Sequence, residues 1–277
     1  MRVLFLLLLF CLNLYADLSG QGDALSVGQG GTTCFLDNAS SAWKNPAQIS
    51  VVTNREADLS CEFLYLGLEP YVYTGDTDYF NHLKFSFVYP LAGSRLGLGI
   101  DQFSSLYFKQ SQFRLTFTER IKSLSLGLNL KYITYSYVRN DYTAINPYFT
   151  SDDLGAENIS LDIGARLEVV RKKVFATLAI LNVNQPDMGM VEEDRLKLQA
   201  VLGAGIRISR FSLSAELEYR DAKIDRAAFG VESTFLSPVF PLRAGFDNTF
   251  LPSIGCSFVI MKDPMAGLDY AARFFSD

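Results

Sequence analysis

A two-residue alternation of apolar and polar side chains runs through most of the chain after residue 55 and limits the folds open to it. In one segment, Ile159, Leu161 and Ile163 alternate with Ser160 and Asp162. Successive side chains of a strand point to opposite faces of a sheet, so this pattern predicts strands with one apolar and one polar face. Thirteen segments are expected to be strands: 56–68, 80–90, 94–103, 111–120, 123–138, 157–171, 173–184, 195–209, 211–221, 226–236, 239–248, 251–261 and 265–275.

The alternation alone leaves open which face of these strands meets water. In a soluble sandwich the apolar face forms the core, whereas in a membrane barrel it faces lipid. The membrane is favoured because the polar face carries charges and glycines, and because aromatic residues such as Tyr89, Phe103 and Phe211 recur near segment ends. Many segments approach the roughly nine to eleven residues that a tilted strand needs to cross a bilayer. We therefore expect an all-β fold, a transmembrane antiparallel β-barrel of about 13–14 strands.

The first residues have the features of an export signal. Arg2 precedes an apolar run, Val3–Leu12, and a small residue, Ala16, follows at a suitable cleavage point. The run is shorter than the roughly 20 apolar residues of a transmembrane helix, and a buried N-terminal strand is the alternative. Residues 1–16 are expected to be a signal peptide, which places the mature chain outside the cytoplasm, in the cell outer membrane.

The connections between the expected strands alternate in length. Long gaps such as 69–79 and 185–194 alternate with tight turns such as 91–93 and 121–122. Outer-membrane barrels have short periplasmic turns and long extracellular loops. The longest loop, 139–156, carries aromatic and acidic residues and motivates an alternative function in which the barrel binds a cell-surface or secretion partner and transports nothing.

Composition excludes several other functions. The net charge of −5 argues against nucleic acid as a partner, because phosphate binding needs a basic surface. His82 is the one histidine and is expected at a loop edge or lumen mouth, and the cysteines show no CxxC spacing, so we expect no metal site. Neither a P-loop nor a nucleophile elbow is present, so no catalytic residue and no cofactor are expected, and a membrane hydrolase lacks a nucleophile–base pair. The disulfide state of Cys34, Cys61 and Cys256 stays open.

Residues 17–54 do not alternate and read as a compact, glycine-rich segment. Gly30 and Gly31 allow close backbone packing. Asp37 or Asn38 can cap a short helix, which must end near Asn45 because the residue before a proline avoids the helical region. A barrel of about fourteen strands has an interior too wide for its own side chains to fill, so such a segment suits a plug.

This segment carries a resemblance to a known superfamily. The glycine-rich stretch, the short helix that follows it and Asn45-Pro46-Ala47 resemble the N-terminal region of the outer-membrane long-chain fatty-acid transporters (the FadL type) and of their secretion-shuttle relatives (the PorV type). The tail, with 241–246 and 268–271, is similar to the penultimate strands of the same superfamily. The resemblance is dense over 20–49 and 239–275 and architectural between them.

The resemblance implies a function and a set of site residues. Residues 17–54 would form a hatch inside a barrel of residues 55–277, and the hatch would gate the uptake of long-chain fatty acids or other hydrophobic small molecules. The partners would be outer-membrane lipid and a hydrophobic ligand, and a non-transporting binding, assembly or shuttle barrel is the alternative. The expected hatch or ligand residues are Gly30, Gly31, Asp37, Asn38, Asn45, Pro46 and Ala47. Arg114, Arg166 and Arg207 are candidate lumenal charges that would steer a carboxylate.

The resemblance also bears on closure of the barrel. Bacterial single-chain barrels have an even strand number, and superfamily relatives add one strand after an element like 268–271. We therefore expect the closing strand to be missing and a seam with few ladder hydrogen bonds between 56–68 and 265–275.

Overall fold

The computed structural model describes residues 23–64, 80–105, 108–138, 154–189, 193–235, 237, 240–248, 252–262 and 265–273. The expected signal peptide and residues 139–153 of the longest loop lie outside the described residues. No helix in the described ranges is long and apolar enough to cross a membrane.

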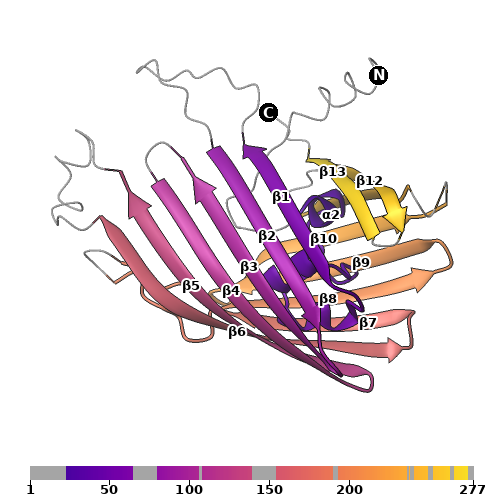
Figure 1. The fold of residues 1–277 in the computed structure, drawn as a ribbon, viewed down its shortest axis with the longest axis horizontal. Coiled ribbons are helices and arrows are strands. Elements are labelled where there is room, and N and C mark those ends of the chain that lie inside the picture. Colours follow the sequence, from indigo (N-terminus) through magenta and orange to yellow (C-terminus); the bar gives the residue numbers. More distant parts are fainter. Residues whose placement is uncertain are drawn as a thin grey trace, which may run out of the picture.

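The described residues form one curved sheet of thirteen antiparallel strands, paired in the order of the sequence (Figure 1). The strands are β1 (Glu56–Leu64), β2 (Phe80–Pro90), β3 (Ser94–Ser104), β4 (Phe108–Ile121), β5 (Leu124–Tyr137), β6 (Gly155–Val170), β7 (Val174–Leu181), β8 (Gln199–Ile208), β9 (Phe211–Arg220), β10 (Lys223–Ser233), β11 (Leu242–Asp247), β12 (Pro252–Lys262) and β13 (Met265–Arg273). The predicted all-β class and the thirteen strands are confirmed. Within the described part of the chain no ladder joins β1 to β13, which is the seam expected between the first and last segments.

Two predicted strands are too long at the loop between β7 and β8. The segment expected over 173–184 ends at Leu181, because Asn182 has a φ of 55° and leaves the extended conformation. The segment expected from residue 195 begins at Gln199, because Leu196 N–H donates to the carbonyl of Pro186 at 2.9 Å and so belongs to the loop. The alternation of apolar and polar residues continues through 196–198, but hydrogen bonding within the loop determines the backbone conformation of these residues.

The burial of side chains is the reverse of that in a water-soluble sheet. Large apolar residues of the outer face are exposed, among them Leu98, Phe113 and Leu128, whereas inward-facing polar residues such as Thr116 and Asn129 are fully buried. A sheet whose apolar face is outside and whose polar face is inside is typical of a barrel that contacts lipid. The soluble sandwich therefore does not account for this chain.

Tight hairpins join several neighbouring strands. Lys122 and Lys172 have φ values of 57° and 58°, and Asp221 and Ala222 have values of 53° and 58°. Two-residue hairpin turns that match the twist of the strands require such left-handed residues. The short turns predicted from the spacing of the segments are therefore present in the β4–β5, β6–β7 and β9–β10 connections.

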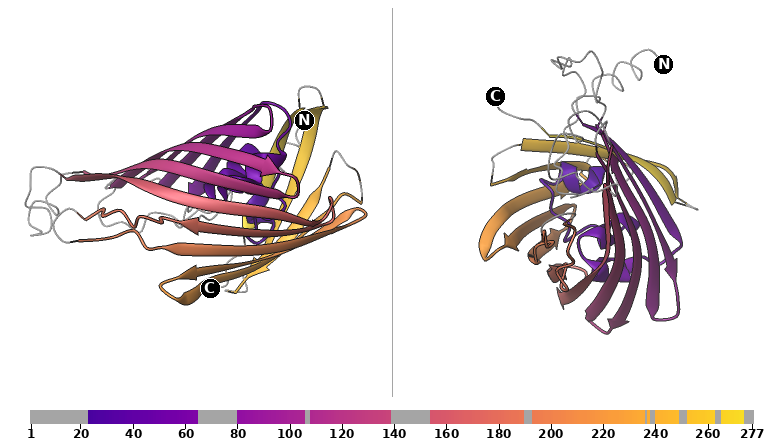
Figure 2. Two further views of the ribbon diagram at one scale, coloured as in Figure 1. Left: turned by 90° about the horizontal axis from the view of Figure 1, so that it is seen from below. Right: turned by 90° about the vertical axis from the view of Figure 1, so that its left-hand side faces the viewer.

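Residues 23–54 lie on the concave side of the sheet, which curls around them (Figure 2). We call this part of the chain the hatch. It contains α2 (Ala24–Gly28) and two 3₁₀ helices, η1 (Ala39–Trp43) and η2 (Pro46–Val51). In the described part of the chain, two clusters of buried apolar residues are small: Ala39, Ala42, Ile49, Val52 and Val88, and Ala179, Leu181 and Val201. Polar contacts therefore dominate the interface between hatch and wall.

Candidate functional site

Each short helix of the hatch begins at a side chain that caps it. Asp23 accepts a hydrogen bond from Ser26 N at 2.9 Å at the start of α2. Asn38 accepts one from Ser41 N at 3.1 Å and begins η1, which confirms it as one of the two caps predicted for this helix. These bonds satisfy backbone N–H groups that a helix start leaves without partners.

Pro46 and Ala47 press directly on the backbone of the wall. A Cβ at Gly127 would lie 2.4 Å from the carbonyl carbon of Pro46 and 2.5 Å from Ala47 N, so only glycine fits there. Thr118 on the neighbouring strand donates to the carbonyl of Pro46 at 2.6 Å. The Pro46–Ala47 peptide is thus seated in a socket that one glycine and one threonine provide.

Asn45 joins this contact to the next pair of strands. Its Oδ1 caps η2 by accepting from Ala47 N at 2.9 Å, and its Nδ2 donates to the carbonyls of Ala165 and Leu178 at 3.2 and 3.3 Å. A Cβ at Gly164 would lie 2.1 Å from Asn45 Oδ1. Asn45 therefore serves as cap and wall anchor at once.

Gly30 and Gly31 fit the hatch against the last strands. Their φ values are 67° and 86°, which favour glycine. Gly30 N donates to Ser253 Oγ at 3.0 Å, and its carbonyl accepts from the Arg226 guanidinium. A Cβ at Gly31 would overlap that guanidinium at 1.4 Å.

Asp37 receives two of the three predicted arginines. Its carboxylate lies 2.9 Å from Arg166 Nη1 and 3.8 Å from Arg207 Nη2. Arg166 also donates to Gln48 Oε1 at 2.6 Å and lies over the ring of Phe175.

The third predicted arginine, Arg114, lies behind the hatch. Its guanidinium carbon is 4.0 Å from the centre of the Trp43 ring, a cation–π contact. Arg114 Nη2 is 3.5 Å from the carbonyl of Ala39. The structure therefore places all three arginines against hatch residues.

A buried cluster of charges secures the middle of the hatch. Lys44 Nζ pairs with Glu216 and lies 2.6 Å from Glu218. It also donates a hydrogen bond to the carbonyl of Gly31 at 2.9 Å. Arg226 Nη1 is 3.0 Å from the same Glu218. The attraction between this buried lysine and its two carboxylates is far stronger than that within an exposed ion pair, because water does not screen it.

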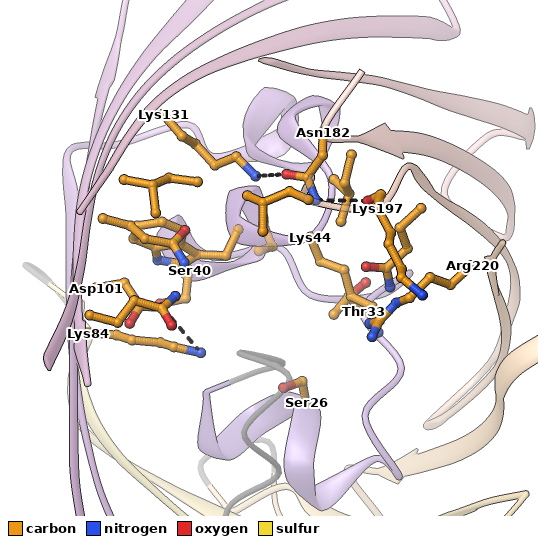
Figure 3. A pocket seen from close by; sticks show the side chains of 18 of the residues that line it. Ser26, Thr33, Ser40, Lys44, Lys84, Asp101, Lys131, Asn182, Lys197 and Arg220 are labelled. Atoms are coloured by element: carbon orange, nitrogen blue, oxygen red, sulfur yellow. Dashed lines mark hydrogen bonds and ion pairs between the residues drawn. The ribbon is translucent and has the colours of Figure 1, made fainter. Parts of the chain in front are cut away.

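A cavity of about 390 Å³ separates the hatch from the wall (Figure 3). Among its described lining residues are six basic side chains and three acidic ones. The basic side chains are Lys44, Lys84, Lys131, Arg195, Lys197 and Arg220, and the acidic ones are Asp23, Asp101 and Asp194. Leu36, Trp43, Ile133, Leu181 and Leu196 supply an apolar part. The cavity thus combines an apolar surface with basic side chains that have carboxylate partners in or beside its lining.

The deeper lysines of the cavity come from different elements and are each held by a carboxylate. Lys131 of β5 lies 2.9 Å from Asp162 and donates to Asn182 Oδ1 at 3.0 Å. Lys84 of β2 lies 3.8 Å from Asp101 of β3. Figure 3 shows Lys84, Lys131 and Lys44 entering the cavity from separate directions.

His82 lies beside this cavity rather than in a loop. It occupies the third position of β2, is buried, and its Nε2 lies 2.6 Å from Asp101 Oδ1. Asp101 thereby joins His82 and Lys84 in one polar group next to the lumen. The sequence placed His82 at a loop edge or lumen mouth, and the structure places it in the strand next to the loop.

The predicted site residues and the cavity are distinct sets. Neither the seven hatch residues nor the three arginines line the cavity, and all ten instead join hatch and wall or shape the hatch. Sequence reasoning did not select Lys44, Lys84 or Lys131 as site residues. Lys84 and Lys131 stand at inward positions of their alternating strands, which was the available signal.

Three of the four cysteines lie in the described part of the chain. Cys34, Cys61 and Cys256 form no disulfide. Cys34 belongs to the hatch and lies 3.5 Å from the carbonyls of Ala204 and Ala215. Burial raises the pKa of its thiol to about 12. Among the described residues no group of histidine, cysteine and carboxylate side chains has an arrangement that would hold a metal ion.

Comparison with known proteins places this architecture. The chain matches no protein-family model and no curated protein. Solved structures do match. The Ralstonia pickettii toluene transporter TbuX aligns over 94% of this chain and 100% of its own, at 13% identity and a TM-score of 0.61. The P. putida toluene transporter TodX has the same coverage and TM-score at 11% identity.

A third match is a TodX variant described as a monoaromatic hydrocarbon channel. It covers 90% of this chain and 92% of its own, at 12% identity and a TM-score of 0.63. At such low identity the likeness establishes the fold. The chain therefore has the fold of these transporters, which is the FadL-type fold that the sequence resemblance implied.

Proposed function

We propose that the chain is a hatch-gated outer-membrane channel that takes up long-chain fatty acids or other hydrophobic small molecules with an anionic head. The fold supports uptake of a hydrophobic compound, because the matching structures are described as toluene transporters and a monoaromatic hydrocarbon channel. The exposed apolar outer face supports a position in the outer membrane.

The cavity between hatch and wall carries the finer part of this proposal. Its apolar part, which includes Leu36 and Ile133, suits an acyl chain, while Lys84 and Lys131 suit a carboxylate. A plain hydrocarbon would leave these charged groups without a partner from the ligand and would gain little from them. The combined lining therefore favours an amphipathic anion over a molecule such as toluene.

Binding of matched ligands to the purified full chain tests this. Palmitate and hexadecanol share an acyl chain and differ in charge, so the ratio of their affinities isolates the contribution of the lysines. We expect palmitate to bind at least about tenfold more tightly than hexadecanol. Lys84→Met should reduce this ratio of affinities severalfold. Lys223→Met, outside the cavity, is the control.

Uptake by proteoliposomes then separates a channel from a binding protein. Labelled palmitate should enter vesicles that contain the full chain faster than empty vesicles. Equal affinity for both ligands would remove the anionic head from the proposal, and binding without uptake would favour the non-transporting alternative.

A further inference from the structure

A second cavity lies at the rim of short turns, apart from the lumenal cavity. It has a volume of about 290 Å³ and forms where the end of η2 meets the β2–β3 and β4–β5 turns. It is lined by Ser50, Val51, Thr53, Gly93, Arg95, Arg120 and Lys122. Three of these side chains are cations, and no acidic residue lines the cavity among the described residues.

The positive charge of this rim cavity is only partly neutralised. Arg120 Nη2 pairs with Glu168 at 3.0 Å. Across the described ranges, no carboxylate lies within ion-pair distance of Arg95 or Lys122. The charges of Arg120 and Glu168 neutralise each other, so the positive charges of Arg95 and Lys122 remain in the cavity.

Arg95 is held in place for a ligand. Its Nε donates to the carbonyl of Val52, and its Nη1 donates to the carbonyls of Ser94 and Leu91 at 2.7 and 3.3 Å. These bonds fix the guanidinium plane against the end of the hatch and leave Nη2 without a bond to any described residue. A guanidinium that is already oriented loses little freedom when an anion binds.

Ser50 supplies an independent sign that a polar ligand belongs there. Its side chain is nearly fully buried, with 2% of its surface exposed, and lines the rim cavity. Its Oγ has no hydrogen-bond partner among the described residues. Buried hydroxyl groups are normally paired, so an unpaired one in a residue that lines a cationic cavity points to an acceptor oxygen supplied from outside.

We propose that this rim cavity binds a phosphate group. The residual charge of the cavity suits a dianion better than a monoanionic carboxylate. A tetrahedral phosphate also has enough oxygens to accept from Arg95, Lys122 and the Ser50 hydroxyl together, which a carboxylate with two oxygens does not. A free phosphate compound supplies two charges and at least three free oxygens, whereas the phosphodiester of a phospholipid in the adjoining leaflet supplies one charge and two free oxygens, so the test separates these two sources.

Two variants remove the recognising groups with little effect on the fold. Lys122→Asn removes the charge at a residue with a φ of 57°, a conformation that asparagine tolerates. Ser50→Ala removes only the unpaired hydroxyl. Lys173→Asn is the matched control, because it removes a charge from the β6–β7 turn outside the rim cavity.

The test has two arms, both with the full chain. In lipid-free detergent, inorganic phosphate is titrated calorimetrically, and we expect Lys122→Asn and Ser50→Ala each to weaken binding by about tenfold and Lys173→Asn to leave it unchanged. In mixed bilayer discs, native mass spectrometry counts the phosphatidylglycerol that stays with the chain, against phosphatidylcholine as the reference lipid.

Each outcome decides the proposal. Loss confined to the first arm assigns the site to free phosphate compounds, and loss of phosphatidylglycerol retention assigns it to the lipid headgroup. If the variants match the unaltered chain in both arms, the rim cavity is not a phosphate site. If acetate competes as well as phosphate, the preference for phosphate is wrong.

Discussion

The hatch contacts the wall in two different ways along the sheet. Against β4–β7 it uses shape: Pro46 and Asn45 fit over Gly127 and Gly164, where a Cβ has no room. Against β8–β11 it adds a buried charge cluster to close backbone contacts: Lys44 lies among Glu216, Glu218 and Arg226, and a Cβ at Gly245 would lie 2.3 Å from Gly30 N. The first contact cannot be loosened by protonation or salt, whereas the second depends on ionised groups.

The difference between these two contacts bears on which side of the hatch is easier to displace. Close-packed backbone has one arrangement and resists small displacements. A cluster of several charges can exchange partners, since Glu218 is within reach of both Lys44 and Arg226. We therefore expect the contact with β8–β11 to respond more to salt than the contact with β4–β7.

Replacing Lys44 should have the largest effect. Lys44→Met leaves Glu216 and Glu218 buried without their lysine, and removing one partner of a buried pair typically costs about 3–5 kcal/mol. Trp43 is the one tryptophan of the chain and lies in the hatch, so its fluorescence during urea titration reports the loss. Lys197→Met breaks the exposed pair with Asp221 and should cost about 0–1 kcal/mol. Equal midpoints for both variants would contradict the charge contact.

Cys34 reports opening of the charge side. Its pKa of about 12 keeps the thiol protonated at pH 8, so its labelling should be roughly a thousandfold slower than that of an exposed thiol and should rise with pH. The measurement uses a background without the other cysteines. Ser209→Cys in an exposed turn, with Cys34→Ser, gives the reference rate. Lys44→Met should accelerate Cys34 labelling, and an unchanged rate would place the release elsewhere.

Gly127→Ala should disturb the shape side by a smaller amount. The added Cβ would meet the backbone of Pro46 at 2.4 Å, and overpacking of this kind costs about 1–3 kcal/mol. At Gly97 the nearest atom is a side-chain atom of Thr116 at 3.1 Å, so Gly97→Ala should cost less. The Gly127→Ala loss should be independent of salt, and a salt-dependent loss would show that the two contacts are not separate.

Substitutions of Asn45 should give the smallest change in stability. They separate the contribution of the helix cap from that of the bonds to the wall. Asn45→Ala removes the cap of η2, which is worth about 1 kcal/mol. Asn45→Ser keeps a capping oxygen but does not reach the carbonyls of Ala165 and Leu178. If urea titration gives equal losses for both variants, the wall bonds rather than the cap hold Asn45.

The parts of the fold that follow local rules could be predicted from the sequence. Alternation located the thirteen strands, and Asn38 and Pro46 bounded η1, because capping and proline geometry depend on a few neighbouring residues, whereas α2 and η2 were not predicted. Strand ends were less predictable where loop hydrogen bonds compete with pairing, as at Leu196.

The partners of the hatch could not be predicted in the same way. Gly127 and Gly164 are directly opposite each other on β5 and β6, and only the register brings them under Asn45 and Pro46. The cavity lysines likewise depend on which inward positions the curvature of the sheet brings together. The sequence indicates the charge of Lys84 and Lys131 and their inward positions on the strands, but it does not indicate their distance from the hatch.

The two small apolar clusters of the interior have a thermodynamic consequence. Exposed apolar surface raises the heat capacity and exposed polar surface lowers it, so an interface of mixed character changes the heat capacity little when it opens. Hatch and wall bury apolar side chains such as Phe35, Ile49 and Phe175 together with many polar ones, so release of the hatch should change the heat capacity less than unfolding of a globular core does. The free energy difference between seated and released hatch would then curve less with temperature than the free energy of unfolding of a globular core.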